Sequence, residues 1–306
     1  MKLSAEEALK SFLEFKSKQP KSKKKGYEKR NLDEETLNKL ETVDKNKILE
    51  LKEKAKQKFD KEVAGFNKLR ISSQGKSHKT QNNQFTGEVI ITQDDCFSSA
   101  ITCLGDSCTL NPAEVFPSVH SSEAGGVFGI DVAEWTTDTH TLYYIFYPNN
   151  NGTLTVTAEI SVSGFVQVVT GDLYYLYTLF PFIEFRNFAQ ATAELEIAIW
   201  QGNIQLPQNE DNPNVNNVVV GNVYCGDSCS NEQSFYSQIF NLTTNAIVEQ
   251  DMWVVIEVNA TVGAIGVSYA AQSFSNFIWS DGDDFKGGFV VNELCADLVT
   301  PVVNPL

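Results

Sequence analysis

Residues 154–162 read Leu-Thr-Val-Thr-Ala-Glu-Ile-Ser-Val, so apolar and polar side chains alternate along the whole stretch. Successive side chains of a β-strand point to opposite faces of the sheet. The pattern therefore predicts a strand with one buried face and one hydrated face. Residues 193–199 repeat it, with apolar residues at every second position and Glu194 and Glu196 between them. Together the two stretches predict a sheet covered on one face.

Further β-rich runs flank these two strands, and no helical periodicity separates them. The runs are residues 88–92, 142–147, 173–179, 218–224, 253–258, 262–269 and 289–291. Turn-forming clusters of Pro, Asn, Gly and Asp interrupt them, as at residues 148–152. Eight or more strands without intervening helices predict an all-β fold, an antiparallel jelly-roll-like β-sandwich.

The N-terminal part of the chain follows a different pattern. Ser4 followed by Glu7 is the signature of a capping box, which predicts a short helix that ends near Lys18. Within residues 31–71, apolar residues recur at helical spacing. The next stretch, residues 72–84, is rich in Ser, Gln and Asn. We expect a basic helical arm over residues 1–30, an amphipathic helical segment over 31–71, a polar linker over 72–84 and the β-sandwich over 85–306.

Charge divides the chain in the same place. Residues 1–80 hold 22 basic and 13 acidic residues, a net charge of +9, whereas residues 81–306 hold 2 basic and 26 acidic residues, a net charge of −24. A body with two cations cannot wrap a phosphate backbone. No stretch approaches the roughly 20 apolar residues of a membrane helix, and the acidic N-terminus is unlike a signal peptide. We therefore expect no membrane span and no secretion by a signal peptide.

A cluster of eight cations and one anion occupies residues 16–30. Clustered Lys and Arg side chains displace counterions from phosphates, so this run predicts binding to nucleic acid. A solvated, disordered tail is the alternative interpretation. The candidate nucleic-acid-binding residues are Lys16, Lys18, Lys21, Lys23, Lys24, Lys25, Lys29 and Arg30.

Catalytic motifs are absent from the sequence. The β-rich part contains two histidines, His120 and His140, and neither adjoins a nucleophile signature. Both are expected to be surface or hydrogen-bonded loop residues, and the protein is not expected to be an enzyme. A hydrolase that uses paired carboxylates, such as Glu194 and Glu196, is the weakest alternative.

Two pairs of cysteines lie in matching fragments. Cys103 and Cys108, like Cys225 and Cys229, close short loops that end in Gly-Asp-Ser-Cys. Four such residues brought together would form a tetrahedral zinc site. Disulfides and buried free thiols are the competing interpretations, and the spacing alone leaves all three open.

Three carboxylates lie close together at Asp281, Asp283 and Asp284. Their oxygen atoms are spaced as Ca²⁺ ligands often are, so a calcium site is one interpretation and an exposed turn is the other. Calcium is the one cofactor that the sequence suggests beside zinc.

Two stretches resemble segments of icosahedral virus capsid proteins with a single jelly roll, of the picorna-like and small RNA or DNA virus type. Residues 180–188, Phe-Pro-Phe-Ile-Glu-Phe-Arg-Asn-Phe, are similar to the segment that opens a central strand, although Asn187 replaces a glycine. Residues 280–289, Ser-Asp-Gly-Asp-Asp-Phe-Lys-Gly-Gly-Phe, are similar to a segment of the last strand. The interval of about 100 residues also agrees with that family.

The resemblance implies a structural role in a virion assembled in a host cell. Many copies would form the shell, the basic arm would face packaged nucleic acid, calcium would lie at subunit contacts, and the exterior would meet a host-cell receptor. The 13 acidic residues of the N-terminal part depart from purely basic capsid arms. The alternative function is a non-enzymatic β-sandwich module that binds a carbohydrate or cell-surface ligand and is anchored by its N-terminal helices.

Overall fold

The computed structural model describes two regions of the chain, an N-terminal helix and a body of strands. The described residues are 3–19, 50, 53, 57, 90–91, 95–97, 99–104, 107–112, 114–121, 135–171, 188–206, 216–226, 228–267, 271–277 and 288–299. The fold is all-β and sandwich-like, and among these residues one helix of any length, α1 (Ala5–Lys18), accompanies the strands. None of the described helices is long and apolar enough to cross a membrane.

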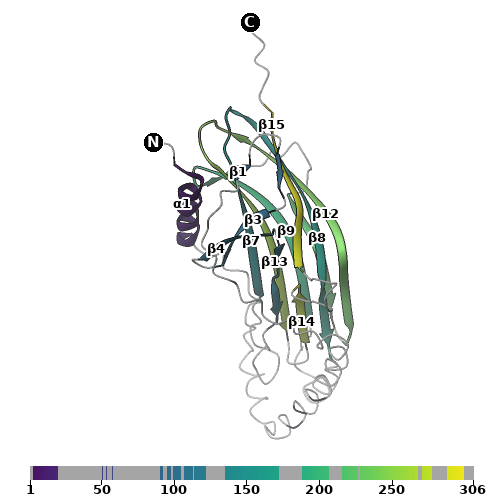
Figure 1. The fold of residues 1–306 in the computed structure, drawn as a ribbon. Coiled ribbons are helices and arrows are strands. Elements are labelled where there is room, and N and C mark those ends of the chain that lie inside the picture. The colour runs from purple at the N-terminus through teal and green to yellow at the C-terminus, as the bar shows by residue number, and fades with distance from the viewer. Residues whose placement is uncertain are drawn as a thin grey trace.

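Seven long strands form most of the two sheets (Figure 1). They are β7 (Thr136–Phe146), β8 (Gly152–Thr170), β9 (Phe188–Gln201), β11 (Asn217–Cys225), β12 (Ser230–Val248), β13 (Val254–Val267) and β15 (Gly288–Val299). Shorter strands are β1 (Ile90–Ile91), β2 (Asp95–Phe97), β3 (Ser99–Leu104), β4 (Ser107–Pro112), β5 (Glu114–Val115), β6 (Ser118–His120), β10 (Ile204–Gln205) and β14 (Ala271–Asn276).

One sheet is built around β13 and the other around β8, and we call them the β13 sheet and the β8 sheet. The β13 sheet has the order β10-β9-β13-β7-β3-β4, with β11 also paired to β9 and β1 to β7. The β8 sheet has the order β2-β15-β8-β14-β6, with β12 also paired to β8 and β5 to β15. Among the described strands, all pairings are antiparallel except that of β1 with β7.

The core lies between the two sheets and follows from the alternation in the sequence. In β8, the side chains of Leu154, Val156 and Ile160 are fully buried, and in β9 the side chains of Leu195 and Ile197 face them from the same apolar cluster. The prediction of two strands with one buried face is therefore confirmed.

Several predicted boundaries differ from the structure. Residues 253–258 and 262–269 were expected to be separate strands, but β13 runs continuously through Asn259 and Thr261. These polar residues lie on the outer face of the sheet, where Asn259 accepts a hydrogen bond from Thr141 at 2.7 Å and the hydroxyl of Thr261 lies 3.1 Å from that of Thr139. β12 and β14 were not predicted, and the run 173–179 lies outside the described residues.

Candidate binding site beneath the N-terminal helix

Helix α1 begins with the predicted capping box. The backbone N–H of Glu7 donates to Oγ of Ser4 at 3.2 Å, and the backbone N–H of Ser4 donates to Oε2 of Glu7 at 2.9 Å. These two bonds satisfy N–H groups that a helix N-terminus leaves without partners. The helix ends as predicted, at Lys18.

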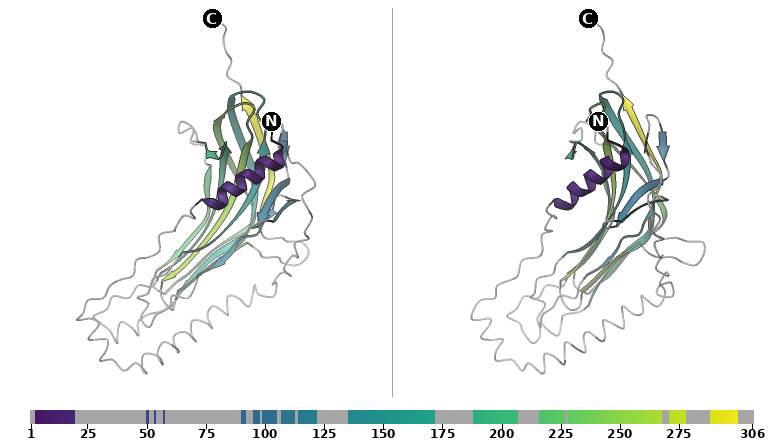
Figure 2. Two further views of the ribbon diagram at one scale, coloured as in Figure 1. Left: turned by 90° about the vertical axis from the view of Figure 1, so that its left-hand side faces the viewer. Right: turned by 60° about the vertical axis from the view of Figure 1, so that its left-hand side comes forward.

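Helix α1 crosses the outer face of the β13 sheet (Figure 2). Its buried residues Ala5, Leu9 and Phe12 join an apolar cluster with Tyr143 and Ile145 of β7 and with Val255 of β13. Trp200 and Trp253 pack against the same cluster. The helix thus covers an apolar patch on a sheet face that is otherwise polar at Thr141 and Asn259.

A buried carboxylate lies under the C-terminal end of α1. Glu257 of β13 is 2% exposed, and its Oε2 accepts hydrogen bonds from Nε1 of Trp200 at 2.8 Å and from Nζ of Lys16 at 3.2 Å. The same ammonium group lies 4.3 Å from the centroid of the Trp200 ring, within cation–π range. The hydrogen-bonded ion pair of Lys16 with Glu257 and the contact of the Lys16 ammonium with the Trp200 ring therefore attach the helix to the sheet at one point.

Burial raises the pKa of Glu257 above its ordinary value, because a desolvated carboxylate is disfavoured. Lys16 and the Trp200 N–H act in the opposite direction, and the negative charge of Glu196 adds a small upward effect. Tyr143 lies opposite Glu257 on the neighbouring strand β7. Its pKa is raised to about 12, mainly by burial and secondly by the negative charge of Glu257. Proton uptake by Glu257 therefore favours the folded state over the unfolded state.

Replacing Glu257 by Gln tests this pH dependence. Glutamine keeps the shape of the side chain and still accepts from Trp200, but it does not titrate. Because the folded pKa of Glu257 is raised, its favourable contribution is complete below about pH 4.5 and is lost as the pH rises through the raised value. We expect the stability of the wild type relative to Glu257→Gln to fall as the pH rises from about 4 to about 8.

Urea unfolding of both proteins over this pH range measures the difference. Glu249→Gln, which removes an exposed carboxylate, is the matched control for the loss of one charge. Stability profiles of wild type and Glu257→Gln that run parallel from acid to neutral pH would contradict the assignment.

A cavity of about 540 Å³ opens beside this contact, between α1 and three turns at the end of the sandwich. Four aromatic side chains form its walls, and Asp251 is the charged residue among those that line it. The lining residues are Leu3, Ala8, Ser11, Phe12, Tyr147, Trp200, Gly202, Asn203, Asp251, Met252, Trp253 and Val255.

The buried amide of Gln201 holds the mouth of the cavity in place. Its Nε2 donates to the backbone oxygens of Glu249 at 2.8 Å and Met252 at 3.0 Å, and its Oε1 accepts from the Glu249 N–H at 2.9 Å. Asn203, in the turn after β9, and Asp251, in the turn after β12, have left-handed φ angles of 62° and 60°. Asn and Asp adopt this conformation more readily than most residues.

The aromatic walls are themselves positioned by hydrogen bonds. Trp253 donates from Nε1 to the backbone oxygen of Leu3 at 2.8 Å, and its ring lies 4.7 Å from that of Tyr147. The Tyr147 hydroxyl donates to Oδ1 of Asp251 at 3.2 Å. Aromatic faces with a few polar groups at the mouth suit a neutral, ring-shaped ligand, and the carboxylate of Asp251 disfavours an anion.

Sequence analysis did not predict this site. Glu257 gave one signal, because it is an acidic residue within the apolar run Trp-Val-Val-Ile-Glu-Val at residues 253–258. Its hydrogen-bond partner Trp200 gave no such signal. The pairing of β13 with β9, which places Val255 beside Trp200, joins parts of the chain that are far apart in the sequence.

The predicted nucleic-acid-binding residues separate into two groups. Lys16 and Lys18 lie on α1, where Lys16 binds Glu257 and Lys18 binds Glu14 at 2.7 Å. The side chain of Lys16 is 33% exposed, so it is largely committed to the sheet. The other candidates, Lys21, Lys23, Lys24, Lys25, Lys29 and Arg30, lie outside the described residues, as do Asp281, Asp283 and Asp284 of the predicted calcium site.

The cysteines are placed in pairs. Cys225 and Cys229 form a disulfide, one of the alternatives that their spacing left open. The backbones of Cys103 on β3 and Cys108 on β4 pair in register. A further disulfide, which the sequence did not predict, joins Cys96 of β2 to Cys295 of β15.

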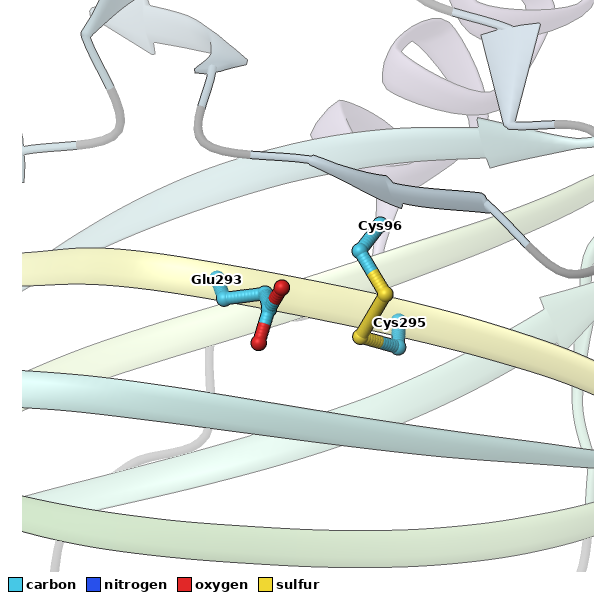
Figure 3. A group of neighbouring side chains, drawn as sticks. All are labelled: Cys96, Glu293 and Cys295. Carbon is cyan, nitrogen blue, oxygen red and sulfur yellow. A yellow bond between two sulfur atoms is a disulfide. The ribbon is translucent and has the colours of Figure 1, made fainter.

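Figure 3 shows Glu293 beside the disulfide of Cys96 and Cys295. The potential ligand atoms of the three residues lie within 4.8 Å of one another. Because the two sulfur atoms are bonded to each other, neither is a thiolate, and the group does not have the donors of a thiolate metal site.

Of the two histidines in the β-rich part, His140 has a described side chain. Its Nε2 lies 3.2 Å from Oδ2 of Asp138, which also accepts the backbone N–H of Ser118 at 3.0 Å. The backbone of His120 pairs with Phe274 at the end of β6. His140 lies on β7 and His120 on β6, so neither is a loop residue.

Comparisons with known proteins give no family. No family model matches the chain, and no curated protein matches it. Two crystal structures of a CocE/NonD family hydrolase from Staphylococcus aureus align at TM-scores of 0.15 and 0.13, with 6% and 5% identity. The alignments cover 56% and 72% of this chain but only 39% and 46% of the hydrolase chains. Similarity at this level carries no argument about fold or activity.

Proposed function

We propose that the protein is a structural subunit of a self-assembling viral capsid, with a jelly-roll body and a basic arm that contacts packaged nucleic acid. The order in which the strands pair carries this proposal. We number the strands with β2 and β5 together as the first and leave aside the short strands β1, β3, β4, β6, β10 and β14. The long strands β7, β8, β9, β11, β12, β13 and β15 are then the second to the eighth.

Under this numbering, the pairings follow a simple rule. The first strand pairs with the eighth, the second with the seventh, the third with the sixth and the fourth with the fifth, all antiparallel. These four pairs are what one long hairpin gives when it rolls into two sheets. The rule matches the eight-stranded jelly roll that recurs in viral capsid and lectin domains.

The two stretches that resemble capsid segments also lead into the expected strands. Phe188, at the end of the first stretch, is the first residue of β9, a central strand of the β13 sheet. Gly288, within the second stretch, is the first residue of β15, the last strand of the chain. This placement supports the resemblance, although residues 180–187 and 280–287 lie outside the described residues.

Charge supports a division of roles between the two parts of the chain. A net charge of +9 in residues 1–80 suits a segment that neutralises phosphates, and a net charge of −24 in the rest keeps the body away from them. Because Lys16 and Lys18 are engaged at α1, the proposal assigns nucleic-acid binding to residues 21–30.

Neutralising the arm tests this assignment. Replacing Lys21, Lys23, Lys24, Lys25, Lys29 and Arg30 by Gln retains α1 and its docking contacts. We expect less co-purifying nucleic acid and a salt dependence of binding that is weaker by about five to six in the slope of log K against log salt. Absorbance ratios and filter binding over a salt series measure both.

The matched control is Lys10→Gln with Lys18→Gln, two exposed cations of α1 that lie outside residues 21–30. An unchanged absorbance ratio and salt slope in the neutralised arm would remove the nucleic-acid role.

A second function is favoured by the cavity beneath α1. Its aromatic walls and the polar side chains of Asn203 and Asp251 that line it suit a neutral sugar, as in a β-sandwich binding module. A glycan array that detects binding by the wild type, but not by Trp253→Ala, would favour this module. An array without any signal would count against it.

A further inference from the structure

Strand β12 forms an outer border of the β8 sheet (Figure 1). Among the described strands it pairs with β8 alone, from Ser230 beside Val169 to Val248 beside Gly152. The backbone donors and acceptors on its other side therefore point away from the sheet. An edge strand of this kind is a template for pairing with another chain unless charges or prolines block it.

The C-terminal part of β12, residues 238–248, carries no such protection. Residues 238–248 read Gln-Ile-Phe-Asn-Leu-Thr-Thr-Asn-Ala-Ile-Val, without a charge or a proline. The bulge of β12 lies before Gln238, so this segment pairs regularly with β8. Ile239 and Ile247 are 53% and 73% exposed on its outward face. The edge is therefore regular, uncharged and apolar at two points.

The segment is also nearly symmetric about Thr243. In an antiparallel pair of two copies centred on this residue, Ile239 lies opposite Ile247 of the partner subunit, and Asn241 lies opposite Asn245 of the partner subunit. Pairs of β-branched residues and hydrogen-bonding pairs directly opposite each other stabilise antiparallel strands. On the inward face the same register places a large residue beside a small one, with Phe240 opposite Ala246 of the partner subunit.

We propose that β12 pairs with β12 of a second copy, antiparallel and centred on Thr243, so that two β8 sheets become one continuous sheet across a two-fold axis. A two-fold interface requires a surface that is complementary to itself, and the sequence of residues 239–247 meets this requirement. The inference rests on the proposed function in taking a second copy of the chain as the occupant.

Charge identifies the same surface. Two bodies with a net charge of −24 each repel one another, and close contact is least costly where both are neutral. Residues 238–248 contain no acidic residue, and the neighbouring edge strand β11 contains none either. A basic partner protein is disfavoured here, because residues 238–248 offer it no carboxylate to pair with.

Two double variants test the register. In Ile239→Lys with Ile247→Lys, like charges lie opposite each other twice, and we expect the dissociation constant of the dimer to rise at least about tenfold. In Ile239→Lys with Ile247→Glu, opposite charges face each other twice, and we expect the constant to return to within about threefold of the wild type. Sedimentation equilibrium of the full chain, in buffer that holds no large particles, measures both.

Val299→Lys adds a charge at a site on β15 that is 57% exposed, and it should leave dimerisation unchanged. Equal dissociation constants for the two double variants would overturn the register, and a wild type that stays monomeric at its solubility limit would overturn the pairing.

Cross-linking gives a second measurement. In the proposed register, Thr243 lies opposite Thr243 of the partner subunit. Asn245 lies opposite Asn241 of the partner subunit, four positions from Asn245 of the partner subunit. Thr243→Cys should therefore form a disulfide-linked dimer on mild oxidation, and Asn245→Cys should not. Equal cross-linking of the two variants would contradict the centre at Thr243.

These outcomes separate the pairing from the capsid proposal. Dimers that depend on β12 without any shells would leave the pairing intact and remove the capsid role. If the variant Ile239→Lys with Ile247→Lys still forms both shells and dimers, the capsid role stays intact and the proposed pairing is removed.

Discussion

Gly164→Ala is expected to lower the free energy of unfolding by about 3 kcal/mol or more. Gly164 of β8 has a φ angle of +151°, which side chains rarely tolerate. A Cβ there would collide with the ring of Phe277 and would lie 2.7 Å from the backbone oxygen of Asn276. Phe277 is fully buried and packs on Phe235 and Phe289, so it cannot yield without disturbing the core.

Gly226→Ala is the matched control for this variant. A Cβ at Gly226 would have its nearest contact at 3.6 Å, with the hydroxyl of Tyr224, and it should change stability by less than about 0.5 kcal/mol. Chemical unfolding of the two variants measures the difference. A difference below about 1 kcal/mol would contradict the packing described for β8 and β14.

Phe12→Ala is expected to release α1 from the β13 sheet while the sandwich stays folded. The ring of Phe12 is 2% exposed and lies 5.4 Å from that of Trp200 and 6.3 Å from that of Tyr143. Its loss costs about 3 kcal/mol of packing. A helix of 14 residues is marginal without such contacts, so release should also unfold it.

Amide hydrogen exchange and tryptophan fluorescence measure this release. The amides of α1 should lose protection, and the emission of Trp200 and Trp253 should shift to the red, while the amides of β8 and β13 stay protected. Lys10→Ala, at an exposed position of the same helix, is the control. Retained protection in α1 would mean that Phe12 does not hold the helix.

The sequence predicts those parts of the fold that depend on neighbouring residues. The alternation from Leu154 to Val162 and the capping box of Ser4 and Glu7 are local patterns, and both are present in the structure. β12 escaped prediction because Ile239 and Ile247 are exposed on its polar face, which obscures the alternation. Its pairing with β8 over its whole length, and not its own composition, makes it a strand.

The site depends on contacts that no local pattern encodes. Lys16 was predicted to bind nucleic acid because it begins a basic run, yet it pairs with Glu257, 241 residues away. The cavity likewise combines α1 with turns after β7, β9 and β12. Such contacts can be recognised in the sequence only through single unusual residues, such as the charged Glu257 within an apolar strand.

Sedimentation velocity of the purified protein of 306 residues, with negative-stain images of the same samples, tests the capsid proposal most directly. Over a series of salt and calcium concentrations, we predict large closed particles of uniform size in exchange with small oligomers. A single species the size of one or two subunits under every condition, with no particles in the images, would contradict it.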